Sequence, residues 1–238
     1  AYDTAATIAA AKALHARAAR PNLLIKIPGT AEGLPAIAEC VASGVPVNVT
    51  LLFSPEQYEA AADAYLTGVE RRLEQQLDPA VGSVASVFMS RWDAAVATRV
   101  PEELKEQLGL AVGLATYRAY RRLMDSDRVQ RVENSGARVQ RLLWASTRTK
   151  DPAASDTLYV HGLAAPFTIN TMPDKTLLAF AEHGQVRDPL SPDGGDSEEL
   201  LGEFEAAGVS VAKLASRLQR EGAKTFDASW SELLQSID

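Results

Sequence analysis

Short apolar runs alternate along the chain with longer segments in which apolar residues recur at helical spacing. Runs with the length of buried strands occupy residues 23–27, 45–50, 83–88, 140–145 and 168–172. Helices are predicted at residues 4–20, 33–44, 55–76, 101–124 and 175–182, with a shorter helical segment starting at Arg91. The tail, residues 197–237, predicts two or three further helices. Because helical sequence follows each predicted strand, the rhythm is typical of parallel β/α units.

Two α/β architectures fit this rhythm. The strands could form an open doubly wound sheet, or they could belong to a β/α barrel whose other strands lie elsewhere. Neither GxGxxG nor GxxxxGK[ST] follows any predicted strand, so the glycine patterns that bind nucleotides in open sheets are missing. This absence favours the barrel, and residues 1–238 then form a single partial barrel domain.

Composition excludes several classes of protein. The apolar fraction of 46% and charged fraction of 23% are those of a globular domain. A net charge of −7 argues against a nucleic-acid partner. No apolar run approaches the roughly 18 residues that span a bilayer, so no membrane partner is expected. The single Cys40 fits a reducing compartment, and with three dispersed histidines it offers no metal-ligand spacing. We therefore expect a cytoplasmic protein without a metal.

Lys26 is the most informative position. It lies inside the apolar run LLIKIP, where a strand buried on both faces is expected and an unpaired ammonium is costly. One interpretation is a lysine at the strand end that reaches solvent or pairs with a carboxylate. The other is a desolvated lysine whose neutral amine attacks a carbonyl. In a β/α barrel, Lys26 would lie near the carboxyl end of its strand, where active sites are built.

Sequence segments around these strand ends resemble the transaldolase family, and the resemblance covers essentially the whole chain. The segments are LLIKIPGTAEG, VPVNVTLLFS, SVASVFMSR and RLLWASTRTK, in this order. The interval from Lys26 to Asn48 also equals the one that the family requires. The resemblance, which is to the larger bacterial type, implies a (β/α)8 TIM barrel of which this chain holds strands 4–8.

The resemblance also implies a role for each polar residue on the strands. Lys26 would form an imine with the ketone of a sugar phosphate. Asn48 and Ser86 would bind hydroxyls of the dihydroxyacetone portion, and Thr50 would order a catalytic water. Without the resemblance, Asn48 and Thr50 could equally cap the turns after a strand, and Ser86 could be a small strand residue.

A phosphate site is implied beside this lysine. Arg91 would bind the phosphate with help from Ser146, and Phe88 would pack near Lys26 and exclude water. Arg148 or Lys150 would supply a second cation, and the sequence leaves the choice between them open. In the alternative interpretation, Arg91 is a surface residue that pairs with Asp93, and Phe88 belongs to the core.

The implied reaction transfers a dihydroxyacetone unit between ketose and aldose phosphates of the pentose phosphate pathway and needs no cofactor. The family's glutamate and aspartate for proton transfer would lie on strands before Ala1. We therefore expect one segment of a longer protein, a monomer or homodimer, that is inactive and poorly soluble alone. Alternatives are a lysine aldolase resembling fructose 6-phosphate aldolase and an inactive barrel fragment that serves as a binding or assembly module.

Overall fold

A five-stranded parallel sheet organises the protein. The computed structural model describes residues 1–186 and 188–237. The strands are β1 (Ile25–Pro28), β2 (Val47–Leu52), β3 (Ser83–Phe88), β4 (Arg141–Ala145) and β5 (Thr168–Asn170). Each pairs in parallel with the next, in the order β1-β2-β3-β4-β5. A doubly wound sheet reverses its order at a switch point, whereas the wall of a β/α barrel does not. The order is therefore that of a barrel wall.

Most helices lie where the sequence pattern predicts them, with shifted ends, but the short helices α6 and α7 were not predicted. They are α1 (Thr4–Ala18), α2 (Gly33–Ala42), α3 (Pro55–Glu74), α4 (Ser90–Val96), α5 (Leu108–Met124), α6 (Asp127–Asn134), α7 (Leu158–His161), α8 (Asp174–His183), α9 (Ser197–Ala206) and α10 (Val211–Gln235). The single helix predicted at 101–124 is wrong in its first part. A 3-10 turn at Glu102–Leu104 ends there because Lys105 is extended and Glu106 has a φ of 59°.

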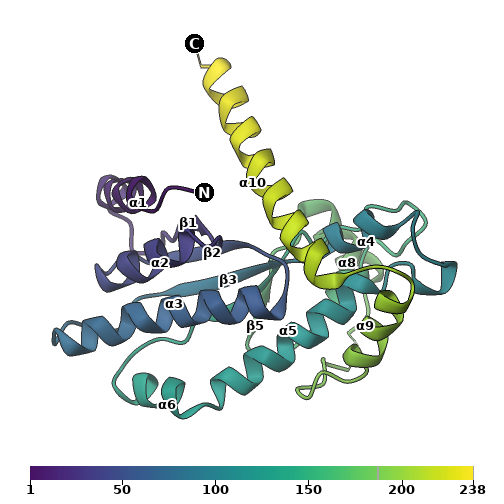
Figure 1. The fold of residues 1–238 in the computed structure, drawn as a ribbon, viewed down its shortest axis with the longest axis horizontal. Coiled ribbons are helices and arrows are strands. Elements are labelled where there is room, and N and C mark those ends of the chain that lie inside the picture. The colour runs from purple at the N-terminus through teal and green to yellow at the C-terminus, as the bar shows by residue number, and fades with distance from the viewer. Residues whose placement is uncertain (187, 238) are drawn as a thin grey trace.

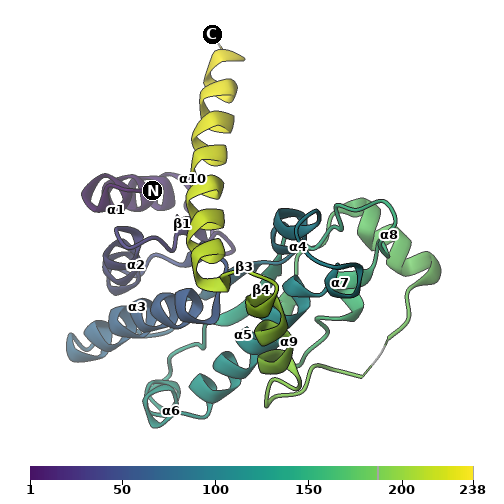
Figure 2. The same cartoon turned by 45° about the vertical axis from the view of Figure 1, so that its right-hand side comes forward.

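One face of the sheet packs on α2, α3 and α5, which lie side by side (Figures 1 and 2). Alternate residues of the central strands point into this layer, and Val47, Val49 and Ala85 are fully buried there. The opposite face carries Lys26, opposite Asn48 in the register of the sheet. Lys26 is exposed and Asn48 half-buried. The expectation that the Lys26 strand is buried on both faces is therefore wrong for the described residues.

A bulge near the end of β2 builds a second core. The register with β3 shifts between Val49 and Leu52, and Leu51 adopts a φ of 60°. Such an extra residue bends the strand and redirects a side chain. Leu51 is thereby fully buried in a separate cluster with residues of β3, α4 and α10 that includes Phe88, Trp92 and Leu218. The bulge thus connects the carboxyl end of β2 to the C-terminal helix.

The long helix α10 is fastened across the strand ends. The Gln219 Nε2 donates to the backbone oxygens of Gly29 and Leu51, both at 3.0 Å. Beyond this attachment the helix continues away from the rest of the molecule (yellow in Figures 1 and 2). Within the described residues, no helix has the combined length and apolar character that a membrane crossing requires.

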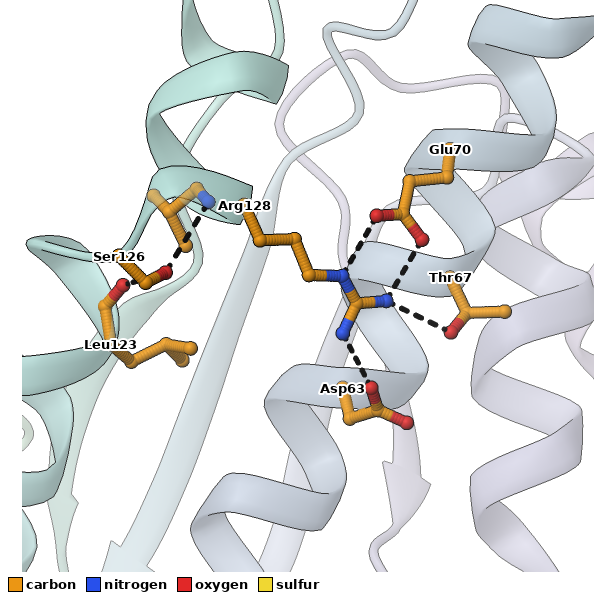
Figure 3. Close-up of polar contacts among 7 residues, drawn as sticks. Asp63, Thr67, Glu70, Leu123, Ser126 and Arg128 are labelled. Atoms are coloured by element: carbon orange, nitrogen blue, oxygen red, sulfur yellow. Dashed lines mark hydrogen bonds and ion pairs between the residues drawn. The ribbon is translucent and has the colours of Figure 1, made fainter.

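Helix α6 was not predicted, and its attachment to α3 is polar (Figure 3). The Ser126 side chain caps its first turn by accepting from the Val129 amide. Arg128 donates two hydrogen bonds to the Glu70 carboxylate of α3, from Nε at 2.7 Å and from Nη2 at 2.8 Å. Its Nη1 also donates to Asp63 at 2.5 Å. The paired geometry of guanidinium and carboxylate fixes the position of α6 on the outer surface.

Candidate active site

Lys26 and Thr50 meet in a cavity at the carboxyl ends of β1 and β2. The register places Pro28 opposite Thr50, and the Gly29 amide donates to the Thr50 backbone oxygen at 2.8 Å. The cavity measures about 240 Å³ and is lined by Ala1, Lys26, Pro28, Thr50, Leu51, Ala223, Phe226 and Asp227. The carboxyl ends of parallel strands are where β/α barrels build their active sites. The local strand pairing therefore brings two predicted site residues together.

The Lys26 amine is partly shielded although the residue as a whole is exposed. Its Nζ lies 5.6 Å from the centre of the Phe226 ring. Among the described residues it forms no ion pair. Partial burial lowers the pKa of the Lys26 amine, because removal of water disfavours the ammonium form. The shift increases the fraction of neutral amine, which is the nucleophilic form.

Two further predicted residues stand in direct contact on β2 and β3. The Ser86 Oγ donates to the Asn48 Oδ1 at 2.7 Å. This bond orients the Asn48 amide and leaves its NH2 group to act as a donor. Asn48 is also the register neighbour of Lys26. The register therefore places an amide donor beside the Lys26 position, and binding of hydroxyls by Asn48 and Ser86 stays a prediction.

Thr50 carries an unsatisfied polar atom. The residue is 2% exposed, and its Oγ1 has no hydrogen-bond partner among the described residues. A buried hydroxyl without a partner costs about 1–3 kcal/mol. Because Thr50 lines the same cavity as Lys26, a water or a substrate hydroxyl bound there would remove that cost.

Arg91 stands at the start of α4, where that helix is joined to the end of β4. The Ser90 amide donates to the Ser146 backbone oxygen at 3.0 Å, and the two hydroxyls lie 3.0 Å apart. Ser146 has a φ of 55°, which turns the chain sharply after the strand. The structure thus holds Ser146 beside Ser90, the residue that precedes Arg91, and a phosphate site at these residues stays a prediction.

The Arg91 guanidinium is half-buried. Burial lowers the pKa of Arg91, and the negative charge of Glu221 opposes this effect. The guanidinium makes no ion pair among the described residues. The alternative in which Arg91 pairs with Asp93 is wrong, because Asp93 accepts hydrogen bonds from the amides of Leu108 and Gly109 instead. A half-buried cation of this kind is suited to binding an anionic group.

The ring over Lys26 was missed by the sequence analysis. Phe88, which was expected near the lysine, contacts Phe53, at 5.4 Å between ring centres, and the Arg91 guanidinium at 5.1 Å. Phe226 of α10 places a second ring over the amine, and Asp227 beside it lines the cavity. The only sequence signal for Phe226 is its place on the apolar side of a predicted tail helix.

Arg148 and Lys150 lie apart from this cavity. Both are exposed and line a different cavity, of about 310 Å³, beside Lys175 and the start of α8. That cavity also contains the carboxylates of Asp151 and Asp156. Neither residue touches the Lys26 cavity, and the question of which one contacts phosphate stays a prediction.

Comparison with known proteins adds a decisive observation to this geometry. A sequence model described as transaldolase/fructose-6-phosphate aldolase matches residues 1–237. The chain belongs to this family. It is 44% identical over 246 residues to a transaldolase from Parafrankia sp. and 45% identical over 245 residues to one from Acidothermus cellulolyticus. A third transaldolase, from Saccharopolyspora erythraea, is 44% identical over 244 residues.

All three alignments cover 100% of this chain but only 66% or 67% of the relative. The chain therefore spans about two thirds of the length of these curated relatives. The transaldolase family has the TIM-barrel fold, and the uninterrupted parallel order of β1 to β5 agrees with it. The predicted family and fold class are both confirmed.

The candidate site draws its side chains from neighbouring strand ends and from the helix that follows β3. No group of His, Cys, Asp or Glu side chains in residues 1–186 and 188–237 has the arrangement of a metal site. Lys26 comes from β1, Asn48 and Thr50 come from β2, Ser86 comes from β3, and Arg91 comes from α4 just after β3. Adjacent strands thus bring four of the predicted site residues together at the carboxyl end of the sheet.

Proposed function

We propose that this chain carries the Schiff-base part of a transaldolase site, with Lys26 as the nucleophile. The observation that carries the proposal is the Lys26 amine, with its lowered pKa, in one cavity with the unpaired hydroxyl of Thr50. The names of the relatives support the same reaction. Asn48 and Ser86 bind hydroxyls of the three-carbon unit, and Thr50 orders water.

In the proposed reaction the neutral amine adds to the ketone of a ketose phosphate, and loss of water gives a protonated imine. This cation accepts the electron pair of the C3–C4 bond, which breaks and releases an aldose phosphate. The three-carbon enamine remains on Lys26 until its carbon attacks the aldehyde of an acceptor aldose phosphate. Hydrolysis of the new imine returns the amine and releases the product ketose. The imine supplies the electron sink, so no cofactor enters the scheme.

Binding of the phosphate is assigned to Arg91 with Ser146, and Phe88 packs beneath the guanidinium. Arg148 or Lys150 adds a further cation. A fixed guanidinium orients a phosphate through paired hydrogen bonds. Proton transfer needs a positioned acid and base. We propose that residues 1–238 are strands 4–8 of the barrel and that these two groups belong to the part of the relatives outside the alignment.

A test separates imine formation from cleavage. The protein is incubated with borohydride and either dihydroxyacetone or fructose 6-phosphate, and adducts are located by peptide mass spectrometry. Dihydroxyacetone requires only the amine, so a reduced adduct on Lys26 is expected. Lys26→Arg abolishes it, because arginine stays protonated and forms no imine. Lys12→Arg is the matched control, since Lys12 pairs with Glu39 on the surface. An intact Lys26 without adduct refutes the proposal.

A lysine aldolase that cleaves without transfer is the second candidate, because the family description includes fructose-6-phosphate aldolase. Erythrose 4-phosphate, added once the enamine has formed on Lys26, distinguishes the aldolase from the transaldolase. Only the transaldolase is expected to couple the three-carbon unit to this acceptor. An inactive fragment that acts as a binding or assembly module would give neither product. We further propose a cytoplasmic location, which the free, buried thiol of Cys40 supports, and a monomer or homodimer.

A further inference from the structure

Helix α10 is attached to the two strands that carry Lys26 and Thr50. Gln219 bonds to the backbone of Gly29, which follows β1, and to that of Leu51 in β2. One turn later, Gly222 allows α10 to approach Leu51 and Arg91 closely. A Cβ atom at Gly222 would lie 2.7 Å from the Leu51 Cδ2 and 3.1 Å from the Arg91 Nη1. Gln219 and Gly222 therefore fix both the rotation and the height of α10 above the strand ends.

This attachment determines which residues face the lysine. Positions three and four apart lie on one face of a helix, so Ala223 and Phe226 follow Gln219 and Gly222 along the contact face. Both line the Lys26 cavity, and the Phe226 ring reaches to 5.6 Å from the Nζ. Phe226 is 41% exposed, so its outer side faces solvent while its inner side faces the amine.

A ring in this position has two opposing effects on the amine. The face of an aromatic ring attracts an ammonium within about 6 Å, which raises the pKa. The same ring removes water from the amine, which lowers the pKa. Burial lowers the pKa of Lys26, and the Phe226 ring is one of the groups that cover the amine. Asp227 is the other titratable side chain that lines the cavity, and the remaining lining residues carry no charged side chain.

We propose that α10 forms one wall of the ketose site and that Phe226 is a positioning residue that shields the Lys26 amine from water. The inference rests on the proposed function for the role of Lys26. Phe226 acts through the lysine and takes no part in bond breaking. Its position on a helix that is bonded to β1 and β2 keeps the shield in register with the amine.

The first measurement follows the amine itself and needs no turnover. The rate of Lys26 acylation by acetic anhydride is measured by peptide mass spectrometry from about pH 6 to about pH 11, the range in which lysine titrates. In Phe226→Ala the midpoint is expected to move to higher pH, because water reaches the amine. In Phe226→Leu an apolar wall remains without a ring face, and the midpoint is expected to stay low. Trp230→Ala is the control, since Trp230 is 60% exposed, lies one turn further along and does not line the cavity.

The second measurement is borohydride trapping with dihydroxyacetone. The Phe226→Ala adduct is expected to fall near neutral pH and to recover as the pH rises, a rescue that a general loss of structure would not give. An unchanged acylation midpoint in Phe226→Ala overturns the inference, and so does an equal shift in Trp230→Ala. A shifted midpoint with no adduct in the unmodified protein supports the shielding by Phe226 and refutes the proposed function. The two failures are therefore distinguishable.

Discussion

Replacement of Asp93 tests how α4, which carries Arg91, is held in place. The Asp93 carboxylate is 2% exposed and accepts from the Leu108 amide at 2.9 Å, from the Gly109 amide at 3.1 Å and from the Tyr159 hydroxyl at 2.5 Å. It therefore joins α4 to the first turn of α5 and to α7.

The expected cost follows from the groups left without a partner. Asp93→Ala removes a helix cap, worth roughly 0.5–2 kcal/mol, and leaves buried donors unsatisfied at about 1–3 kcal/mol each. Because losses within one network are not additive, we expect about 3–5 kcal/mol of unfolding free energy in total. Asp93→Asn keeps one acceptor oxygen and places its NH2 group against a donor. We expect it to cost about 1–2 kcal/mol.

The cost of Asp93→Asn should also depend on pH. Burial raises the pKa of Asp93, and the hydrogen bonds from Tyr159 and the two amides oppose this. Between about pH 4, the unfolded value, and the raised folded pKa, the native protein binds more protons than the unfolded chain. The stability contributed by Asp93 therefore falls as pH rises through this window. Asparagine does not titrate, so the difference between the two proteins should grow on acidification.

Glu106 should strengthen the pH dependence of the cost of Asp93→Asn. The pKa of Glu106 is raised by burial and secondly by the charge of Asp93, so Asp93→Asn also removes part of the shift at Glu106. The assay is urea unfolding followed by circular dichroism at several pH values. Glu103→Gln is the control, because Glu103 is exposed and makes no side-chain ion pair among the described residues. The reasoning would be refuted if the loss of unfolding free energy in Asp93→Asn became smaller on acidification, or if it equalled the loss in Glu103→Gln.

Two further substitutions test the attachments of α6 and α10 by thermal unfolding. Arg128→Ala should cost about 1–2 kcal/mol because it removes a paired and partly buried interaction, whereas Arg122→Ala, whose side chain is 71% exposed, should cost about 0.5 kcal/mol or less. Gly222→Ala should destabilise, since the overlap with the fully buried Leu51 costs about 1–3 kcal/mol and outweighs a gain of about 1 kcal/mol in helix propensity. Gly202→Ala has open space and should stabilise; equal effects of the two alanines would contradict the close approach of α10.

The strands were predictable because their burial is reflected in the residues of each short segment. Val47, Val49, Ala85 and Val87 alternate toward the helices and are fully buried, so short apolar runs identify them. Helix α6 was not predictable in this way. Only Val129 and Val132 of its eight residues are buried, and its position depends on contacts with α3, which lies far away in sequence. Tertiary polar contacts leave no periodic signal in a short segment.

The candidate site also has a part that local sequence predicts and a part that it does not. Lys26, Asn48, Thr50 and Ser86 lie on paired strands, so a residue order and a strand register suffice to bring them together. The apolar sequence around Lys26 did not predict that one face of its strand would be exposed. An apolar run does not indicate which neighbouring elements cover each face.

The position of Phe226 over Lys26 could not be predicted from local sequence. Its place over Lys26 depends on Gln219, which bonds to residues 190 and 168 positions away, and on a glycine whose importance lies only in what it approaches. Yet the shielding of the amine decides how much of it is neutral, and a neutral amine is the condition for imine formation. The identity of the proposed nucleophile is therefore a property of β1, whereas its proposed reactivity depends on the contact between β1 and α10. A substitution that leaves every strand residue intact, such as one at Gly222, should for that reason still change the reaction at Lys26.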